Sequence, residues 1–256
     1  MFEELNRLAG WSTEKLPDRE VIFITDKGCN GTFLLHHFIA LYLKAGQHVV
    51  LVTVEQSFAH YSVACGKLGA NLTKSKTEGK LTHVDMMKAG LNEYLQESSP
   101  TDQLSKGFSN KTLEQLNDMI HDLVNSVPVD KKSIVIVDDL SLFLSLGFPI
   151  EDVITFYHKM KYITRTKPAS FLTVLHLDGS AEDLPTLYPN FSYYGTCELK
   201  LEGLESGYSK DVHGTLEVIQ KSMKNLRTVF ERKVRQYKVT ERTLHLFAPG
   251  TSKAVL

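Results

Sequence analysis

The segment VIFITDKGCNGTF, residues 21–33, identifies this chain as an α/β protein. Its apolar run at 21–25 predicts a buried strand, and residues 32–45 predict a helix that ends at Gly46. A buried strand, a short turn with glycine and a helix whose amino terminus points at the turn form the architecture of a phosphate-binding loop. We therefore expect a ligand-binding edge, if the protein has one, beside this turn.

The turn lacks most of the residues that bind a nucleotide. In the working form GxxxxGK[S/T], glycines let backbone amides wrap the phosphates, the lysine reaches the terminal phosphates and the hydroxyl binds magnesium. Of the octet DKGCNGTF at residues 26–33, only Gly31 matches. Asp26 replaces the first glycine, Thr32 the lysine and Phe33 the hydroxyl. Because the Asp26 carboxylate also repels phosphate, we expect a structural loop that binds no nucleotide.

Strands and helices alternate outward from this segment, which predicts a parallel sheet with right-handed crossovers. Further strands are expected at residues 48–55, 80–84, 133–138 and 171–177, with helices at 57–69, 113–127 and 149–166. Beyond residue 195, the strands at 197–201 and 215–219, and those at 237–239 and 243–247, read as antiparallel pairs.

The chain as a whole is expected to be one α/β domain, residues 1–256. Its mostly parallel central sheet would be flanked by helices and extended by antiparallel strands over residues 196–250. The polar residues 98–110 predict a mobile surface loop.

Acidic residues end two of the expected strands. The run IVIVD, residues 134–138, resembles a Walker B strand that holds magnesium, and Asp139 follows it. Glu55 stands where recombinase-type ATPases keep the acid that activates water. With no phosphate held opposite, we favour solvated strand ends or loop caps for Asp138, Asp139 and Glu55.

No other constellation predicts catalysis or a metal site. His176 and Asp178 could be drawn with Ser57 or Ser141 as a hydrolase triad, but the chain has no GxSxG elbow. The remaining candidate histidines read as packing or surface residues, and the three cysteines lie far apart: His36, His37, His60, Cys29, Cys65 and Cys197. We expect no catalytic residues, no metal and no cofactor.

Charge is balanced over the chain but segregated near its end. The 29 basic and 30 acidic residues give a net charge of −1, which excludes an overall basic nucleic-acid coat protein. Between residues 219 and 242, only Glu231 and Glu241 oppose eight basic residues: Lys221, Lys224, Arg227, Arg232, Lys233, Arg235, Lys238 and Arg242. The first seven are RNA-binding candidates. An acidic protein partner, or a solvated hairpin face with no specific role, stays an open alternative.

Neither secretion nor membrane insertion is expected. The first residues carry acids where a secretion signal needs basic residues and an apolar core. The longest apolar stretch, residues 33–43, is broken by His36 and His37 and is too short to span a bilayer. We expect an intracellular protein without a membrane partner.

Several segments resemble the family of the sixth subunit of the eukaryotic Elongator complex, nearly end to end and in the same order. The opening FITDKGCNGTFLLHHFIALYLKAG and SFAHYSVACGKLG carry the likeness, as does the closing FAPGTSKAVL. The most specific segments are VDDLSLFLSLG and GYSKDVHG, at residues 137–147 and 207–214.

This resemblance implies a RecA-like fold whose nucleotide loop has lost its signature. It also implies a heterohexameric ring with Elongator subunits four and five, two copies of each. The ring would join the catalytic subcomplex, bind tRNA and support modification of the wobble uridine, with any ATP hydrolysis belonging to the assembly. The resemblance further implies a cytoplasmic and nuclear protein. Two alternatives remain: a stand-alone RecA-like ATPase with an unorthodox loop, and a regulatory adaptor that binds only protein.

Overall fold

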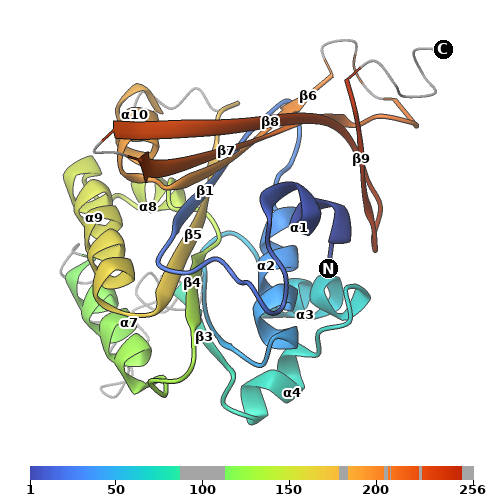
Figure 1. Ribbon diagram of the computed structural model, residues 1–256. Coiled ribbons are helices and arrows are strands. Elements are labelled where there is room, and N and C mark those ends of the chain that lie inside the picture. Colours follow the sequence, from blue (N-terminus) through green and yellow to red (C-terminus); the bar gives the residue numbers. More distant parts are fainter. Residues whose placement is uncertain (87–112, 179–183, 205–206, 208, 225–226, 250–256) are drawn as a thin grey trace.

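A single mixed sheet of nine strands forms the centre of the computed structural model (Figure 1), which describes residues 1–86, 113–178, 184–204, 207, 209–224 and 227–249. The strand order is β3-β2-β4-β5-β1-β6-β7-β8-β9. The strands are β1 (Val21–Lys27), β2 (His48–Thr53), β3 (Leu81–Asp85), β4 (Ser133–Val137), β5 (Ala169–His176), β6 (Cys197–Gly203), β7 (Gly214–Lys224), β8 (Arg227–Val239) and β9 (Leu244–Phe247).

Helices cover both faces of the sheet (Figure 1). One face is covered by α1 (Glu3–Ala9), α2 (Phe33–Lys44), α3 (Phe58–Lys67) and α4 (Leu72–Thr77). The other is covered by α7 (Glu114–Ser126), α8 (Leu142–Ser145), α9 (Ile150–Thr166) and α10 (Leu184–Tyr194). Among these described helices, none has both the length and the apolar character needed to cross a bilayer.

The parallel part of the sheet follows from strands that are apolar on both faces. All five residues of β4 are buried, and so are the first six of β1. Strands of this kind need helices on each side, which the crossovers supply. The parallel pairs join β3, β2, β4, β5, β1 and β6 in turn. Their carboxyl ends therefore meet at one edge, where ligands of such sheets bind.

The C-terminal end of the sheet is antiparallel, and the expected fold class is confirmed. β6 joins the two parts, because it lies parallel to β1 and antiparallel to β7. The expected strand at 237–239 was too short, since β8 is a 13-residue strand that pairs with the whole of β7. The loop expected at residues 98–110 lies outside the described residues.

Candidate functional site

Three backbone donors of the loop after β1, those of Gly28, Gly31 and Thr32, are bound by side chains of the chain itself. The Gly31 N–H donates to Asp26 Oδ2 at 2.6 Å, and the Gly28 N–H donates to Asp178 Oδ2 at 2.6 Å. Asp26 is 1% exposed, so its carboxylate lies inside the loop. These are the donors that a phosphate group would need in a working loop of this kind.

Asn30 binds the next donors, at the start of α2. Its Oδ1 accepts the Thr32 N–H at 2.8 Å and the Thr32 hydroxyl at 2.6 Å. Phe33, in the position of the magnesium-binding hydroxyl, packs its ring against Phe2 and Tyr237, with ring centroids 5.9 Å away in both cases. Thr32 and Phe33, at the lysine and hydroxyl positions of a working loop, thus contact other residues of the same chain.

Gly31 has a structural reason to be glycine. A Cβ atom there would lie 2.8 Å from Leu201 Cδ1, 2.9 Å from Ile24 Cγ2 and 3.2 Å from Asp26 Oδ2. Distances below 3 Å force neighbouring atoms to move. The one octet position that matches the phosphate-binding pattern is therefore required by packing between β1 and β6.

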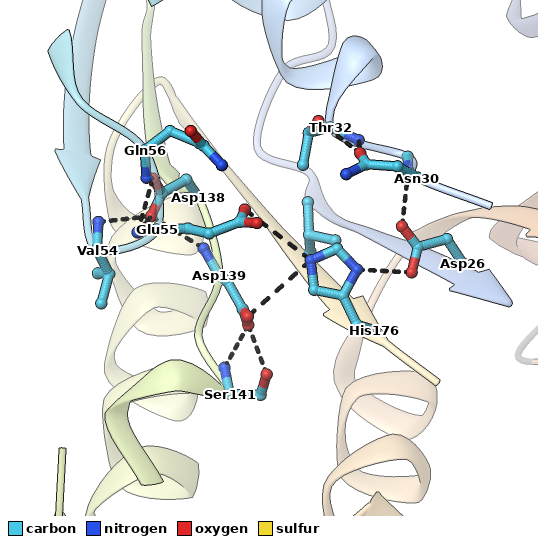
Figure 2. A network of polar contacts seen from close by, with 12 residues as sticks. Asp26, Asn30, Thr32, Val54, Glu55, Gln56, Asp138, Asp139, Ser141 and His176 are labelled. Atoms are coloured by element: carbon cyan, nitrogen blue, oxygen red, sulfur yellow. Dashed lines mark hydrogen bonds and ion pairs between the residues drawn. The ribbon is translucent and has the colours of Figure 1, made fainter. Parts of the chain in front are cut away.

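His176, at the end of β5, lies among three carboxylates: Asp26 of β1, Glu55 after β2 and Asp139 after β4 (Figure 2). Its Nδ1 bonds Asp26 Oδ1 at 2.7 Å, and its Nε2 lies 4.0 Å from both Glu55 Oε2 and Asp139 Oδ2. The hydrogen bond to Asp26, together with the charges of all three acids, raises the pKa of His176 to about 9. The imidazole is therefore charged at neutral pH and serves as the cation of this cluster.

Asp138 connects β4 to the segment that follows β2 (Figure 2). Its carboxylate accepts the N–H groups of Val54, Glu55 and Gln56 at 2.6 to 3.2 Å, and the hydroxyl of Tyr61 lies 3.3 Å away. Burial raises the pKa of Asp138 to about 6, against the effect of these backbone bonds. Asp138 acts as a buried loop cap and is not a solvated strand end.

Asp139 holds the turn that leads into α8. Its Oδ1 accepts the N–H and the hydroxyl of Ser141, at 2.7 and 2.6 Å. Ser57 Oγ instead accepts the His60 N–H as the N-cap of α3. Neither serine is hydrogen-bonded to His176 in the described part of the chain, so the arrangement does not form a nucleophile and base pair.

Taken together, this edge is acidic, and the amides of Gly28, Gly31 and Thr32 are already bonded to side chains of the chain. The described residues bring Asp26, Glu55 and Asp139 around one imidazolium, and no lysine stands in the octet position that would neutralise terminal phosphates. An added phosphate would meet this excess of negative charge at short range and would have to displace three side-chain oxygens from the loop.

The seven basic candidates lie on the hairpin of β7 and β8 and are divided between its faces. Lys233 donates to the Leu8 carbonyl of α1 at 3.0 Å, and alternation along β8 places Arg227 and Arg235 on the same strand face. On the opposite face are Lys221, Arg232 and Lys238. The side chain of Lys224 lies outside the described part. The candidates therefore do not make one continuous patch.

Several of these basic groups already have partners. Lys221 donates to the Ser192 carbonyl and lies over the Phe230 ring, and burial lowers its pKa. Arg232 and Lys238 pair with Glu217 and Asp211 at 3.8 and 3.6 Å, and Lys233 pairs with Glu231 at 2.9 Å. Among the candidates whose side chains the structure describes, Lys221 is thus the least available to RNA.

The histidines of α2 contribute to packing. His37 is fully buried, accepts the Phe2 N–H at 2.8 Å, and has its pKa lowered to about 3 by burial. The rings of His36 and His60 lie 5.5 Å apart. The described residues contain no group of three or more histidine, cysteine, aspartate or glutamate side chains that could hold a metal ion.

Sheet order, flanking helices and the strand–loop–helix opening define an α/β protein with a mixed, mostly parallel sheet, in which the chain's own side chains bind amides of that loop. A family model described as Elongation complex protein 6 matches residues 2–241. The chain belongs to this family.

Curated relatives agree over the whole chain. Elongator complex protein 6 of Xenopus laevis is 32% identical over 266 residues, and that of Homo sapiens is 30% identical over 269, with all of both chains covered in each case. Elongator complex protein 6 of Dictyostelium discoideum is 21% identical over 321 residues, with 94% of each chain covered. The chain is thus an Elongator complex component, and the resemblance noted from its motifs is confirmed.

The sequence analysis did not predict that Asn30 accepts hydrogen bonds from Thr32, or that Tyr61 lies within hydrogen-bond distance of Asp138. A local signal existed for Asn30, because an asparagine two residues before a threonine N–H forms an Asx turn. The bond between Asp178 and Gly28 has no such signal, since the two residues are 150 positions apart.

Proposed function

We propose that this chain is a non-catalytic subunit of a RecA-like heterohexameric ring, formed with Elongator subunits four and five. The ring binds tRNA and supports modification of the wobble uridine. The observation that carries the non-catalytic role is the loop of residues 26–33, whose donors are bound by Asp26, Asn30 and Asp178. Family membership supports the other Elongator subunits as partners.

A ring subunit can keep its fold after losing phosphate chemistry. RecA-like domains pack head to tail around a ring, so each subunit needs two different surfaces and a fixed shape. The internal bonds of Asp26 and Asp138 preserve that shape at the edge where nucleotide would otherwise bind. We attribute any ATP hydrolysis to the assembled ring.

Co-expression with subunits four and five tests the assembly. We expect the tagged chain to purify as one complex whose native mass corresponds to two copies of each of three subunits. A monomer, or an oligomer of this chain alone, under conditions where subunits four and five are soluble would overturn the ring proposal.

Nucleotide titration of the purified chain tests the non-catalytic role. We expect no saturable binding of a fluorescent ATP analogue with Mg²⁺ to the chain alone. Saturable binding that disappears in Asp26→Ala or Lys27→Ala would instead support the stand-alone ATPase.

Charge reversal in the assembled ring tests the contact with tRNA. Arg227 and Arg232 have exposed side chains on opposite faces of β8. If the hairpin contacts the tRNA backbone, Arg227→Glu with Arg232→Glu will weaken tRNA binding by about tenfold and reduce its salt dependence, while the ring stays intact. Lys15→Glu with Arg165→Glu makes the same change of charge at exposed residues outside the hairpin and serves as the control. Loss of the ring together with tRNA binding would favour the adaptor that binds only protein.

We further propose that the protein resides in the cytoplasm and the nucleus. A tagged full-length chain expressed at its natural level should be seen in both compartments by microscopy. Restriction to any other compartment contradicts this proposal.

A further inference from the structure

The outer edge of β8 lacks a strand partner over most of its length. β7 pairs with one side of β8 from Arg227 to Tyr237, but β9 pairs with the other side only from Gln236 to Val239. No described strand continues along residues 227–235 on that side, and the side chains there are exposed or half-buried. An edge of this length is a template for adding an extended chain through backbone hydrogen bonds.

A basic groove lies beside this edge, on the strand face toward α1. It has a volume of about 370 Å³ and is lined by Glu4, Arg7, Leu8, Lys233, Arg235 and Leu246. Within the described part of the chain, no ion pair joins Arg7 or Arg235 to an acid. The nearby acids are engaged, because Glu4 accepts the Leu246 N–H at 2.6 Å and Glu231 pairs with Lys233 at 2.9 Å. The groove can therefore accept carboxylates, which arginine binds through two parallel hydrogen bonds.

The opposite face of the hairpin offers apolar surface. Phe230 and Val234 of β8 are 53% and 40% exposed, and Met223 of β7 is 68% exposed. Because side chains alternate along a strand, Phe230 and Val234 point away from the face of Lys233 and Arg235. A chain added at this edge would meet Lys233 and Arg235 on one face, and Phe230 and Val234 with Arg232 between them on the other.

We propose that residues 227–235 of β8 bind an extended segment of a partner protein in which acidic and apolar side chains alternate. Its backbone continues the sheet, its acids enter the groove of Arg7 and Arg235, and its apolar side chains cover Phe230 and Val234. The chain's own residues 250–256 contain Lys253 and no aspartate or glutamate, so they lack the alternating acidic side chains that this proposal requires. This inference goes beyond the ring proposal and does not depend on it.

A synthetic peptide of alternating glutamate and valine, about ten residues long with blocked ends, is the probe. We expect it to bind the full-length chain in a fluorescence anisotropy titration and to slow hydrogen exchange of amides within residues 227–235. The same peptide with lysine in place of glutamate should not bind. Failure of the glutamate peptide to bind, or exchange protection at the β3 edge instead, overturns the proposal.

Matched charge reversals identify the groove. Arg235→Glu and Arg7→Glu should each weaken peptide binding by about tenfold. Arg165→Glu makes the same charge change at an exposed residue of α9, away from β8, and should change affinity by less than about twofold. Equal losses for all three variants would indicate general attraction and contradict the proposal. Binding of an oligouridylate that is lost in Arg235→Glu, without peptide binding, would assign the groove to RNA and overturn it. The test of tRNA binding by the assembled ring uses Arg227 and Arg232, whereas the peptide test uses Arg7 and Arg235. Failure of one proposal can therefore be told apart from failure of the other.

Discussion

Asp26 links two strands and the loop between β1 and α2 through one carboxylate. Its Oδ2 accepts the Gly31 N–H, and its Oδ1 bonds His176 on the neighbouring β5. A carboxylate that is 1% exposed is tolerated only when both oxygens have partners. Asp26, the residue that most weakens the nucleotide-binding pattern, thus forms two hydrogen bonds that hold the folded site together.

The ion pair between His176 and Asp26 predicts a pH-dependent contribution to stability. The folded-state pKa of His176 is raised from 6.5 to about 9, so its contribution is complete below about pH 6.5 and is lost as the pH rises through 9. His176→Gln keeps a donor but not the charge. We expect it to lower the free energy of unfolding by about 1–2 kcal/mol near pH 6, and by much less near pH 10.

Urea unfolding of both proteins at several pH values provides this measurement. Groups such as Glu20 and Asp138 titrate in both proteins. Their contributions therefore cancel when the unfolding free energy of the variant is subtracted from that of the unaltered protein. A difference in unfolding free energy that is constant from pH 6 to 10 would contradict the charged state of His176.

Two glycines give a matched pair of substitutions. Gly31→Ala places a Cβ within 3 Å of Leu201 and Ile24, so we expect the free energy of unfolding to fall by about 1–3 kcal/mol. Gly66 lies inside α3 with open space around it, so Gly66→Ala should raise stability by about 0.5–1 kcal/mol. Thermal melts of the two variants should therefore shift in opposite directions, and a shared direction would contradict this packing argument.

At the level of elements, the segment after β2 depends on an acid of β4. Three consecutive N–H groups, of residues 54–56, converge on Asp138, which is fully buried. This arrangement fixes the path from β2 into α3 through the chain's own groups. The acid of a Walker B-like strand therefore orders the neighbouring loop.

Asp138→Asn should loosen that loop. An asparagine offers one acceptor oxygen, and its NH₂ group faces backbone donors, so we expect the free energy of unfolding to fall by about 2–3 kcal/mol. Hydrogen exchange of the amides at residues 54–56 should accelerate more than that of β1. Asp122→Asn, at an aspartate whose side chain is 84% exposed, should change neither quantity. Uniform acceleration across the sheet would contradict a local role.

Elements with a strong hydrophobic pattern were predictable from sequence, and others were not. β1, β2 and β4 are apolar runs, and α9 has buried residues at helical spacing. α10 was missed because it contains Pro189, and α4 and α8 are too short to show a period. Most of β8 was missed because few of its side chains are buried. Its sequence is rich in charged residues and lacks the alternation of apolar and polar residues that indicates a strand.

The site at the sheet edge was predictable in outline only. The carboxyl ends of parallel strands meet in space, so Asp26, Glu55 and Asp138 could be expected near one another. Which of them would bond to the loop amides depends on contacts between residues far apart in sequence, such as His176 with Asp26. No local pattern encodes such pairs.

Considered as a whole molecule, the protein exposes large apolar side chains on the hairpin and on α9 and α10. Tyr162 and Tyr193 are 64% and 77% exposed, and Met223 and Phe230 exceed half exposure. Apolar surface of this kind marks sites of protein association. The isolated chain should consequently self-associate.

Replacing Met223 and Phe230 by threonine should reduce that self-association. Both residues are exposed on β strands, where threonine is well tolerated, so the melting temperature should change little. Light scattering of the chain alone at increasing concentration is the measurement. Val129→Thr, at a residue 97% exposed outside the hairpin, serves as the control and should leave association unchanged. If both changes reduce self-association equally, the hairpin is not the surface through which the chains associate.

The internally bonded loop also separates the lifetime of this subunit from the energy supply of the cell. A protein whose folded state binds ATP is stabilised in proportion to the logarithm of the ATP concentration. Such a protein therefore unfolds more often when the ATP concentration falls. Here Asp26, Asn30 and Asp178 make such bonds from within the chain itself. The folded fraction, and with it exposure to proteases, would stay constant during starvation while nucleotide-dependent proteins became less stable.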